Sequence, residues 1–162
     1  MKSLFVILLV IFSLSGFSQI SKVSIQASGL TCSMCSNAIN KALKSLDFVE
    51  KVDANIKNST FELTFKSGRY IDFNLLKKKV EDAGYSVANF AATVQFNNVQ
   101  VKGGQPVSVG DYAFEIINAG DKVLNGLKEL RFIDKGFLSG KEYKKNSSAM
   151  VVTTKGVYHT LI

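Results

Sequence analysis

The sequence predicts an α+β protein in which a βαββαβ unit is followed by a smaller, mainly β domain. Two observations lead to this prediction. Between residues 19 and 90, stretches that alternate apolar and polar residues are interleaved with two stretches whose apolar residues recur at helical spacing. From residue 91 onward, the chain consists mostly of short alternating stretches separated by turns that contain glycine or asparagine.

The first 18 residues are predicted to be a secretory signal peptide. Lys2 precedes the apolar run 4–12, as in the charged and hydrophobic parts of such peptides. The run is shorter than the about 20 residues that a membrane-spanning helix needs. Gly16 and Ser18 are small residues placed for a cut before Gln19. An uncleaved anchor is the alternative. With cleavage, the mature protein is exported to the periplasm or the extracellular space and is not an integral membrane protein.

The first domain, residues 19–90, begins with a strand and a helix. Residues 23–28 alternate apolar and polar side chains, which is the pattern of a half-buried strand, and Gly29 ends it. Further along, apolar residues recur at spacings i, i+3, i+4 and i+7 and form one helix face: Ile39, Ala42, Leu43 and Leu46. This spacing places the start of the helix close to Cys35.

The remaining elements complete the βαββαβ order. A less regular strand is predicted at 48–54, and a clear one at 61–65 ends before a turn. A second helix is predicted over about 72–83, with Asp72 as its N-cap and Gly84 as its stop. Residues 85–90 then form the closing strand. This order is typical of a ferredoxin-like fold, in which two helices pack on an antiparallel sheet.

Both cysteines of the chain, Cys32 and Cys35, lie where the first strand passes into the first helix. The partial positive charge and free N–H groups of a helix N-terminus favour the thiolate, the form that binds metal. Two thiolates suit a soft ion of low coordination number, such as Cu(I). A structural zinc site normally takes four protein ligands, and the only histidine, His159, lies in the other half of the chain. The pair therefore predicts a two-thiolate metal site that is open to ligand exchange.

Residues 21–90 resemble the heavy-metal-associated domain family, which includes copper chaperones and the N-terminal modules of copper-transporting ATPases. The resemblance rests on the βαββαβ order, on Gly-Leu-Thr-Cys-Ser-Met-Cys at 29–35 and on Asp-Ala-Gly-Tyr at 82–85. Two positions depart from the family: Leu30 stands where a methionine is frequent, and Phe48 where a glycine is common. Neither departure removes a metal ligand.

The resemblance implies the ion, the partner and the surroundings of the site. The ion is expected to be Cu(I), and the partner a metal-donor or metal-acceptor protein such as a copper transporter. Tyr85 is expected in the loop beside the metal, where it would shield the site from solvent. Thr31 and Met34, which adjoin the two cysteines, are further candidates for the surroundings of the metal, Met34 also as a thioether ligand.

Three alternatives remain open for the cysteine pair. A Cys-x-x-Cys pair after a strand also occurs in thiol–disulfide exchange proteins. Here, however, Thr31 rather than an aromatic residue precedes the pair, and the only proline, Pro106, is far away in sequence. A structural disulfide would close a loop too short to remove much chain entropy. Another soft ion, such as mercury or zinc, is the third alternative. We predict a metal-binding protein rather than an enzyme, with a pair that must stay reduced or metallated outside the cytosol.

The second half, residues 91–162, is predicted to form a small β domain, either an OB-like barrel or a sandwich. Turns are predicted at 97–98, 102–104 and 118–121. Ser139, three positions before Glu142, predicts the N-cap of one short helix.

No catalytic set is recognisable in this half. The acidic residues, Glu115 and Asp134 among them, are interpreted as unpaired, and His159 as a hydrogen-bonded strand residue rather than a metal ligand. The net charge of +7 is not gathered into a dense Lys/Arg stripe, so nucleic acid is not expected as a partner.

Overall fold

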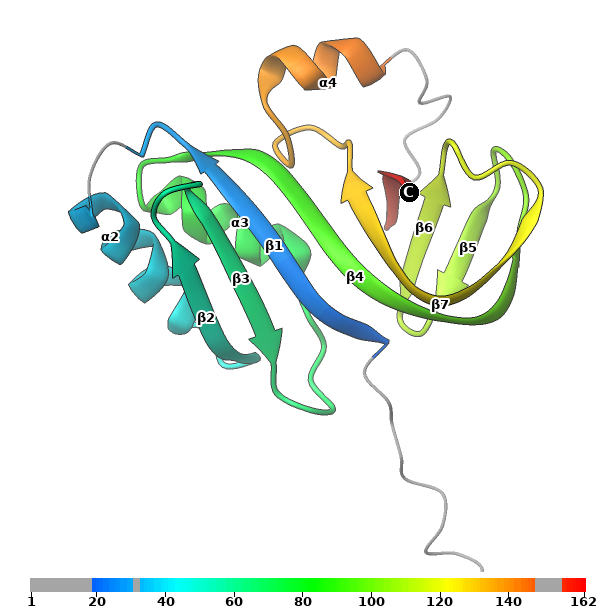
Figure 1. The fold of residues 1–162 in the computed structure, drawn as a ribbon, viewed down its shortest axis with the longest axis horizontal. Helices are drawn as coiled ribbons and strands as arrows, with labels where there is room; N and C mark the ends of the chain where they lie inside the picture. Colours follow the sequence, from blue (N-terminus) through cyan, green and yellow to red (C-terminus); the bar gives the residue numbers. More distant parts are fainter. Residues whose placement is uncertain (1–18, 31–32, 148–155) are drawn as a thin grey trace, which may run out of the picture.

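The computed structural model describes residues 19–30, 33–147 and 156–162 of the chain. Within them, eight strands form one sheet in the order β2-β3-β1-β4-β7-β8-β6-β5 (Figure 1). The elements are β1 (Ile20–Ser28), α2 (Ser33–Lys44), β2 (Val49–Asn55), β3 (Thr60–Phe65), α3 (Phe73–Asp82), β4 (Ser86–Val101), β5 (Pro106–Val109), β6 (Tyr112–Ile116), β7 (Lys122–Phe132), α4 (Gly140–Asn146) and β8 (Val157–Leu161). The predicted signal peptide lies outside the described residues. No helix in the described part of the chain is long and apolar enough to span a membrane.

The first half has the predicted ferredoxin-like architecture. Its four strands follow the order β2-β3-β1-β4, and each neighbouring pair is antiparallel. Helices α2 and α3 lie together on one face of this part of the sheet (Figure 1). The buried face of β1 is formed by Val23, Ile25 and Ala27, as the alternation predicted, because only this face of the strand is covered by the helices.

The second helix starts and stops at the residues that the sequence indicated. The Leu75 backbone N–H donates a hydrogen bond to Asp72 Oδ1 at 2.9 Å, which satisfies one of the free donors of the first turn of α3. After the helix, Gly84 adopts a φ of +89°. This left-handed conformation favours glycine and lets the chain turn back into β4.

Strand β4 runs through the predicted domain boundary at residue 90. It spans 16 residues and pairs with β1 through its first part and with β7 along most of its length. The predicted turn at 97–98 is wrong. Instead, Phe96 pairs with Gly126 and Val99 with Leu124, so β4 carries one extra residue, a β-bulge. Asn98 has a φ of +52°, a conformation that asparagine tolerates in bulges and turns alike.

The second half extends the same sheet and does not form a closed barrel among the described strands. β5 and β6 form a hairpin, and β8 inserts between β6 and β7, parallel to β6 and antiparallel to β7. The order of strands ends at β5. The predicted helix cap is confirmed, since the Glu142 N–H donates to Ser139 Oγ at the start of α4.

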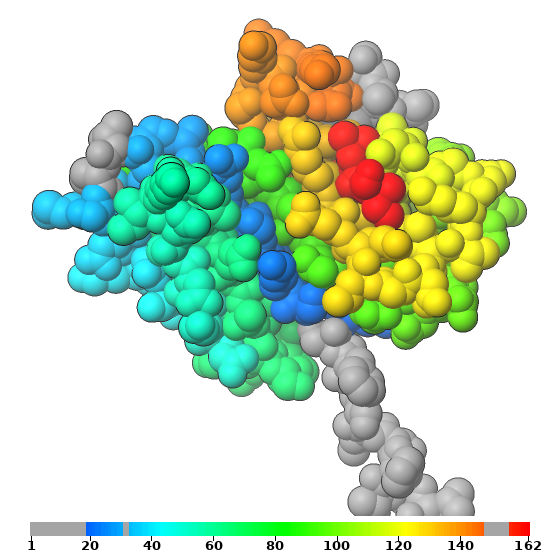
Figure 2. All heavy atoms as spheres, in the orientation of Figure 1, coloured from blue at the N-terminus to red at the C-terminus, as the bar shows by residue number. Residues whose placement is uncertain are grey.

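The two halves share one hydrophobic core. Phe73, the first residue of α3, is fully buried. Its ring lies 5.0 Å from that of Phe132 on β7, 5.1 Å from Tyr112 on β6 and 5.3 Å from Tyr158 on β8. In the space-filling view the two halves meet without a gap (Figure 2). The division into two domains therefore stays a prediction from composition, whereas the aromatic contacts join both parts.

Candidate metal centre

The described cysteine, Cys35, lies in the first turn of α2, as the third residue of the helix that starts at Ser33. Its side chain is half-buried. The turn contains no acidic side chain, so the partial positive charge of the helix end is not offset there and favours a thiolate. β1 ends just before this segment, and Gly29 turns the chain out of the strand with a φ of +82°. Cys32 and Thr31 lie outside the described residues.

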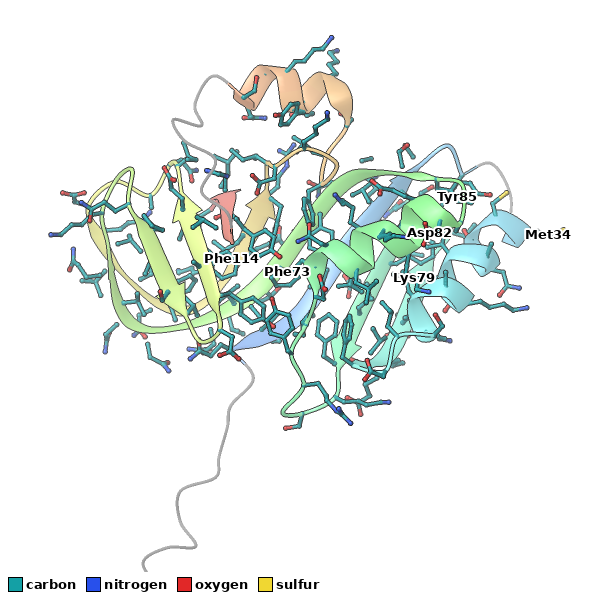
Figure 3. The ribbon with its side chains drawn as sticks, turned by 180° about the vertical axis from the view of Figure 1, so that it is seen from behind. Met34, Phe73, Lys79, Asp82, Tyr85 and Phe114 are labelled. Carbon is teal, nitrogen blue, oxygen red and sulfur yellow. The ribbon has the colours of Figure 1, made fainter. Side chains whose placement is uncertain are left out.

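A second loop lies beside the one that leads into α2. Ser28 at the end of β1 pairs with Ser86 at the start of β4, and its hydroxyl donates to the Ser86 carbonyl at 3.2 Å. The segment between α3 and β4, which contains Tyr85, therefore adjoins the segment that follows β1. Figure 3 shows Tyr85 and Asp82 at the same end of the molecule as Met34. Tyr85 therefore lies in the segment between α3 and β4, and its place beside a metal ion stays a prediction.

Met34 points away from the body of the protein (Figure 3). Its side chain is 81% exposed. Tyr85, in contrast, is half-buried and packs against the core, and its backbone N–H donates to the Val80 carbonyl at 3.2 Å. The two candidates therefore differ in exposure. The thioether of Met34 faces solvent, whereas the side chain of Tyr85 packs against the core at this end of the domain.

Sequence reasoning missed a polar side chain beside the cysteine. Ser36 is only 3% exposed, and its hydroxyl has no hydrogen-bond partner in the described part of the chain. The sequence contained a signal for it, because Ser36 stands three and seven positions before Ile39 and Leu43 and so shares the buried stripe of α2. A serine on an apolar helix face is easily counted as an interruption of the stripe rather than as part of it.

A second buried polar group lies in the other half of the sheet. His159 on β8 is fully buried. Its Nδ1 is 2.7 Å from Asp134 Oδ1, and its Nε2 is 3.6 Å from Glu115 Oε2. The prediction that His159 is a hydrogen-bonded strand residue is confirmed, but the interpretation of Glu115 and Asp134 as unpaired is wrong. Within the described residues no group of three or more His, Cys, Asp or Glu side chains is suited to hold a metal ion.

The fold and the cysteine at the helix start define a class of small α+β metal-binding domains. The profile of the heavy-metal-associated domain matches residues 14–86. A "Probable copper-exporting P-type ATPase" from Archaeoglobus fulgidus is 38% identical over 71 residues, which cover 44% of this chain and 9% of that protein. A mercuric transport protein periplasmic component from Pseudomonas fluorescens is 35% identical over 63 residues, 39% of this chain and 68% of that protein.

Among solved structures, a CopZ metallochaperone is 26% identical, with a TM-score of 0.39, and covers 42% of this chain and 100% of its own. The chain belongs to the heavy-metal-associated domain family. The matched region ends at residue 86, so it includes the site and stops where β4 begins.

Proposed function

We propose that this protein is an exported carrier of a soft metal ion that binds Cu(I) through the thiolates of Cys32 and Cys35. The main support is the position of Cys35 at the exposed end of a helix whose first turn has no acidic side chain. The printed names of two relatives refer to copper and to mercury, both soft ions that prefer thiolate ligands. The partner would be a protein that donates or accepts the metal, such as a copper transporter.

The proposed transfer is an exchange of ligands and requires no catalysis. Cu(I) bound by two thiolates forms a complex with one net negative charge. A thiolate or thioether of the partner adds to the ion, one cysteine leaves as a thiolate, and a second exchange releases the other. The oxidation state of copper does not change. Because Cu(I) accepts both two and three ligands, a half-exposed Cys35 allows each step to proceed through an intermediate that both proteins share.

The test is a competition titration of the reduced protein from Gln19 onward. We expect it to take about one Cu(I) per chain from a chromophoric chelator and to prefer Cu(I) over Zn(II). Cys32→Ser and Cys35→Ser should each weaken Cu(I) binding by more than about 100-fold, since removal of a ligand should exceed the loss caused by outer partners. Ser33→Ala, an exposed neighbour in the same turn, is the matched control and should bind normally.

The same experiment separates the alternatives. If the wild-type protein fails to compete for Cu(I) yet reduces a disulfide substrate with turnover, the pair is a thiol–disulfide exchange site. If Hg(II) is retained against a thiol competitor that removes Cu(I), the cargo is mercury. Normal Cu(I) binding by either serine variant would contradict the two-thiolate site.

Export is a separate part of the proposal, and it rests on the apolar run 4–12 and the small residues before Gln19. Expression of the full chain in a bacterial host should yield periplasmic protein whose mass corresponds to a start at Gln19. A protein that keeps residues 1–18 and stays with the membrane fraction would contradict cleavage and favour an anchor.

A further inference from the structure

The short helix α4 carries its lysines on one face. Lys141, Lys144 and Lys145 stand at positions i, i+3 and i+4 of this helix, and residues at these spacings are neighbours on a helix surface. All three are exposed. None of them forms an ion pair within the part of the chain that the structure describes. We call these three side chains the α4 lysine face.

The other side of α4 holds the helix on the body of the protein. Tyr143 is half-buried and packs against the hydrophobic core, and Arg131 Nη2 donates a hydrogen bond to Glu142 Oε2 at 3.1 Å. Just before the helix, the Ser139 backbone N–H donates to the Ala88 carbonyl at 3.2 Å. These contacts fix which side of α4 faces inward, so the lysine face is directed to solvent.

The arrangement of these lysines is unfavourable within the helix itself. Like charges at i, i+3 and at i, i+4 repel each other and destabilise a helix. Lys144 and Lys145 lie in the last turn, where the helix dipole favours cations, but Lys141 lies in the first turn, where the dipole disfavours them. A glutamate in place of Lys141 would relieve both effects. The gathered positive charge is therefore expected to serve an anionic partner outside the chain.

The composition and shape of the α4 lysine face favour a lipid surface over a protein as that partner. Protein interfaces are enriched in arginine and aromatic residues and depleted in lysine, and their binding energy comes from buried anchors. No large apolar side chain that is exposed in the described residues belongs to α4. Figure 1 shows α4 outside the layers of the sheet, and Figure 2 shows its side chains projecting from the described surface. A projecting group of lysines can approach a flat layer of anionic headgroups, which attract it without a specific geometry.

Helix α4 also begins near the cysteine end of the first half. Ala88, which accepts the hydrogen bond from Ser139, lies two residues after Ser86 in β4. Ser86 in turn pairs with Ser28 at the end of β1, just before the segment that leads into α2. A surface bound by the α4 lysine face would therefore lie on the side of the molecule to which β1 delivers the cysteine segment.

We propose that the α4 lysine face binds the protein reversibly to membranes that contain anionic lipids. Lipid rather than nucleic acid is the polyanion here, a choice that rests on the proposed export. The binding is electrostatic, because Tyr143 is packed against the protein core and does not insert into a bilayer. Each lysine near an anionic surface strengthens binding about fivefold, so three lysines contribute about 100-fold. Such binding is weakened by salt and brings the cysteine end toward the membrane.

The test is co-sedimentation of the protein from Gln19 onward with lipid vesicles. Vesicles of equal parts phosphatidylcholine and phosphatidylglycerol are compared with vesicles of phosphatidylcholine alone. At low salt the wild-type protein should bind only the anionic vesicles, and about 1 M salt should release it, because the screening length is then about 3 Å. The triple variant Lys141→Gln, Lys144→Gln and Lys145→Gln should bind about 100-fold more weakly. Glutamine is as good a helix former as lysine, so the urea midpoint should stay close to that of the wild type.

The first half offers a matched control with the same net charge. Lys41 and Lys44, in the last turn of α2, and Lys66, after β3, are also exposed lysines. The triple variant Lys41→Gln, Lys44→Gln and Lys66→Gln removes as much charge as the α4 variant but leaves the α4 lysine face intact. It should weaken vesicle binding by less than about fivefold, the contribution of a single lysine at the surface.

Four results would overturn the inference. Equal losses in the two triple variants would mean that net charge alone attracts the vesicles. Equal binding to neutral and anionic vesicles would exclude an electrostatic contact, and no binding at low salt would exclude the contact altogether. Binding to a polyglutamate peptide but not to vesicles would assign the α4 lysine face to an acidic protein. None of these results involves the Cu(I) titration, so failure here and failure of the metal site are distinguished.

Discussion

Two buried polar side chains, Ser36 on α2 and His159 on β8, have opposite surroundings. The Ser36 hydroxyl has no partner among the described residues. His159 is fully buried, yet its ring contacts carboxylates on two sides, and its backbone N–H donates to Asp134 Oδ2 at 2.8 Å. A buried polar group that serves the fold is satisfied within the fold. Ser36, in contrast, contributes no side-chain hydrogen bond to the fold of the described residues.

The contacts of His159 explain how the last strand is held. β8 has only two paired residues on β7 and four on β6. Asp134, just after the end of β7, binds both the ring and the backbone of His159, while Glu115 approaches the ring from β6. The side chains therefore link β6, β7 and β8 where backbone pairing is short.

The largest effect is expected for Phe73→Ala, which tests whether the two regions belong to one cooperative unit. Phe73 on α3 contacts rings on β6, β7 and β8, so its truncation opens a cavity between the halves. We expect the free energy of unfolding to fall by about 4 kcal/mol. Urea unfolding followed by far-UV circular dichroism and by tyrosine fluorescence should still give one coincident transition.

A matched truncation is Phe65→Ala, since Phe65 is only half-buried and its ring neighbour Phe48 also belongs to the first half. Its cost should be smaller. Two separated transitions in the wild-type protein would show that the halves unfold independently, and then the comparison between Ser36 and His159 would concern two domains rather than one.

A smaller but still large effect is expected for Asp134→Ala. Loss of this carboxylate leaves the buried His159 ring and its backbone N–H without their short hydrogen bonds. Removal of one partner of a buried polar pair should lower the free energy of unfolding by about 3 kcal/mol. The Cu(I) dissociation constant should not change, because Asp134 is remote from α2 in the sheet order.

The control for this variant is Asp121→Ala. Asp121 also accepts a hydrogen bond from a backbone N–H, that of Gly103 at 2.9 Å, but it does so at the surface. The loss of an exposed hydrogen bond should cost about 1 kcal/mol or less. Equal destabilisation by Asp121→Ala and Asp134→Ala would contradict a special role for the His159 contacts.

Sequence patterns predicted the first half well because its determinants are local. The buried stripe of α2, the Asp72 cap and the alternation in β1 each lie within a few residues of one another. The contacts of His159 join residues 25 and 44 positions away, Asp134 and Glu115, and no spacing rule connects such distant positions. Insertion of β8 between β6 and β7 is equally non-local. The bulge at Asn98 was missed for another reason, since the same residue type is typical of turns and of bulges.

The smallest effect is expected at Tyr158, the strand neighbour of His159, and it depends on pH. Asn74 Nδ2 donates to the Tyr158 hydroxyl at 3.1 Å. Burial raises the pKa of Tyr158 well above its ordinary value, and nearby groups such as Tyr70 and Asp72 raise it further. Above about pH 10 the unfolded chain therefore releases this proton while the folded protein keeps it. The contribution of Tyr158 to stability is complete below that pH and is lost as the pH rises.

Tyr158→Phe should accordingly lower the free energy of unfolding at pH 7 by about 1 kcal/mol, because the hydrogen bond with Asn74 is lost. Between pH 10 and pH 11, however, the variant should lose less stability than the wild-type protein. Asn74→Ala separates the two effects: it removes the same hydrogen bond but keeps the phenol, so it should retain the full alkaline sensitivity. Urea midpoints of the three proteins at each pH measure this. Parallel loss of stability in all three proteins would show that folding does not raise the pKa of Tyr158, which would contradict the effect of burial at this position.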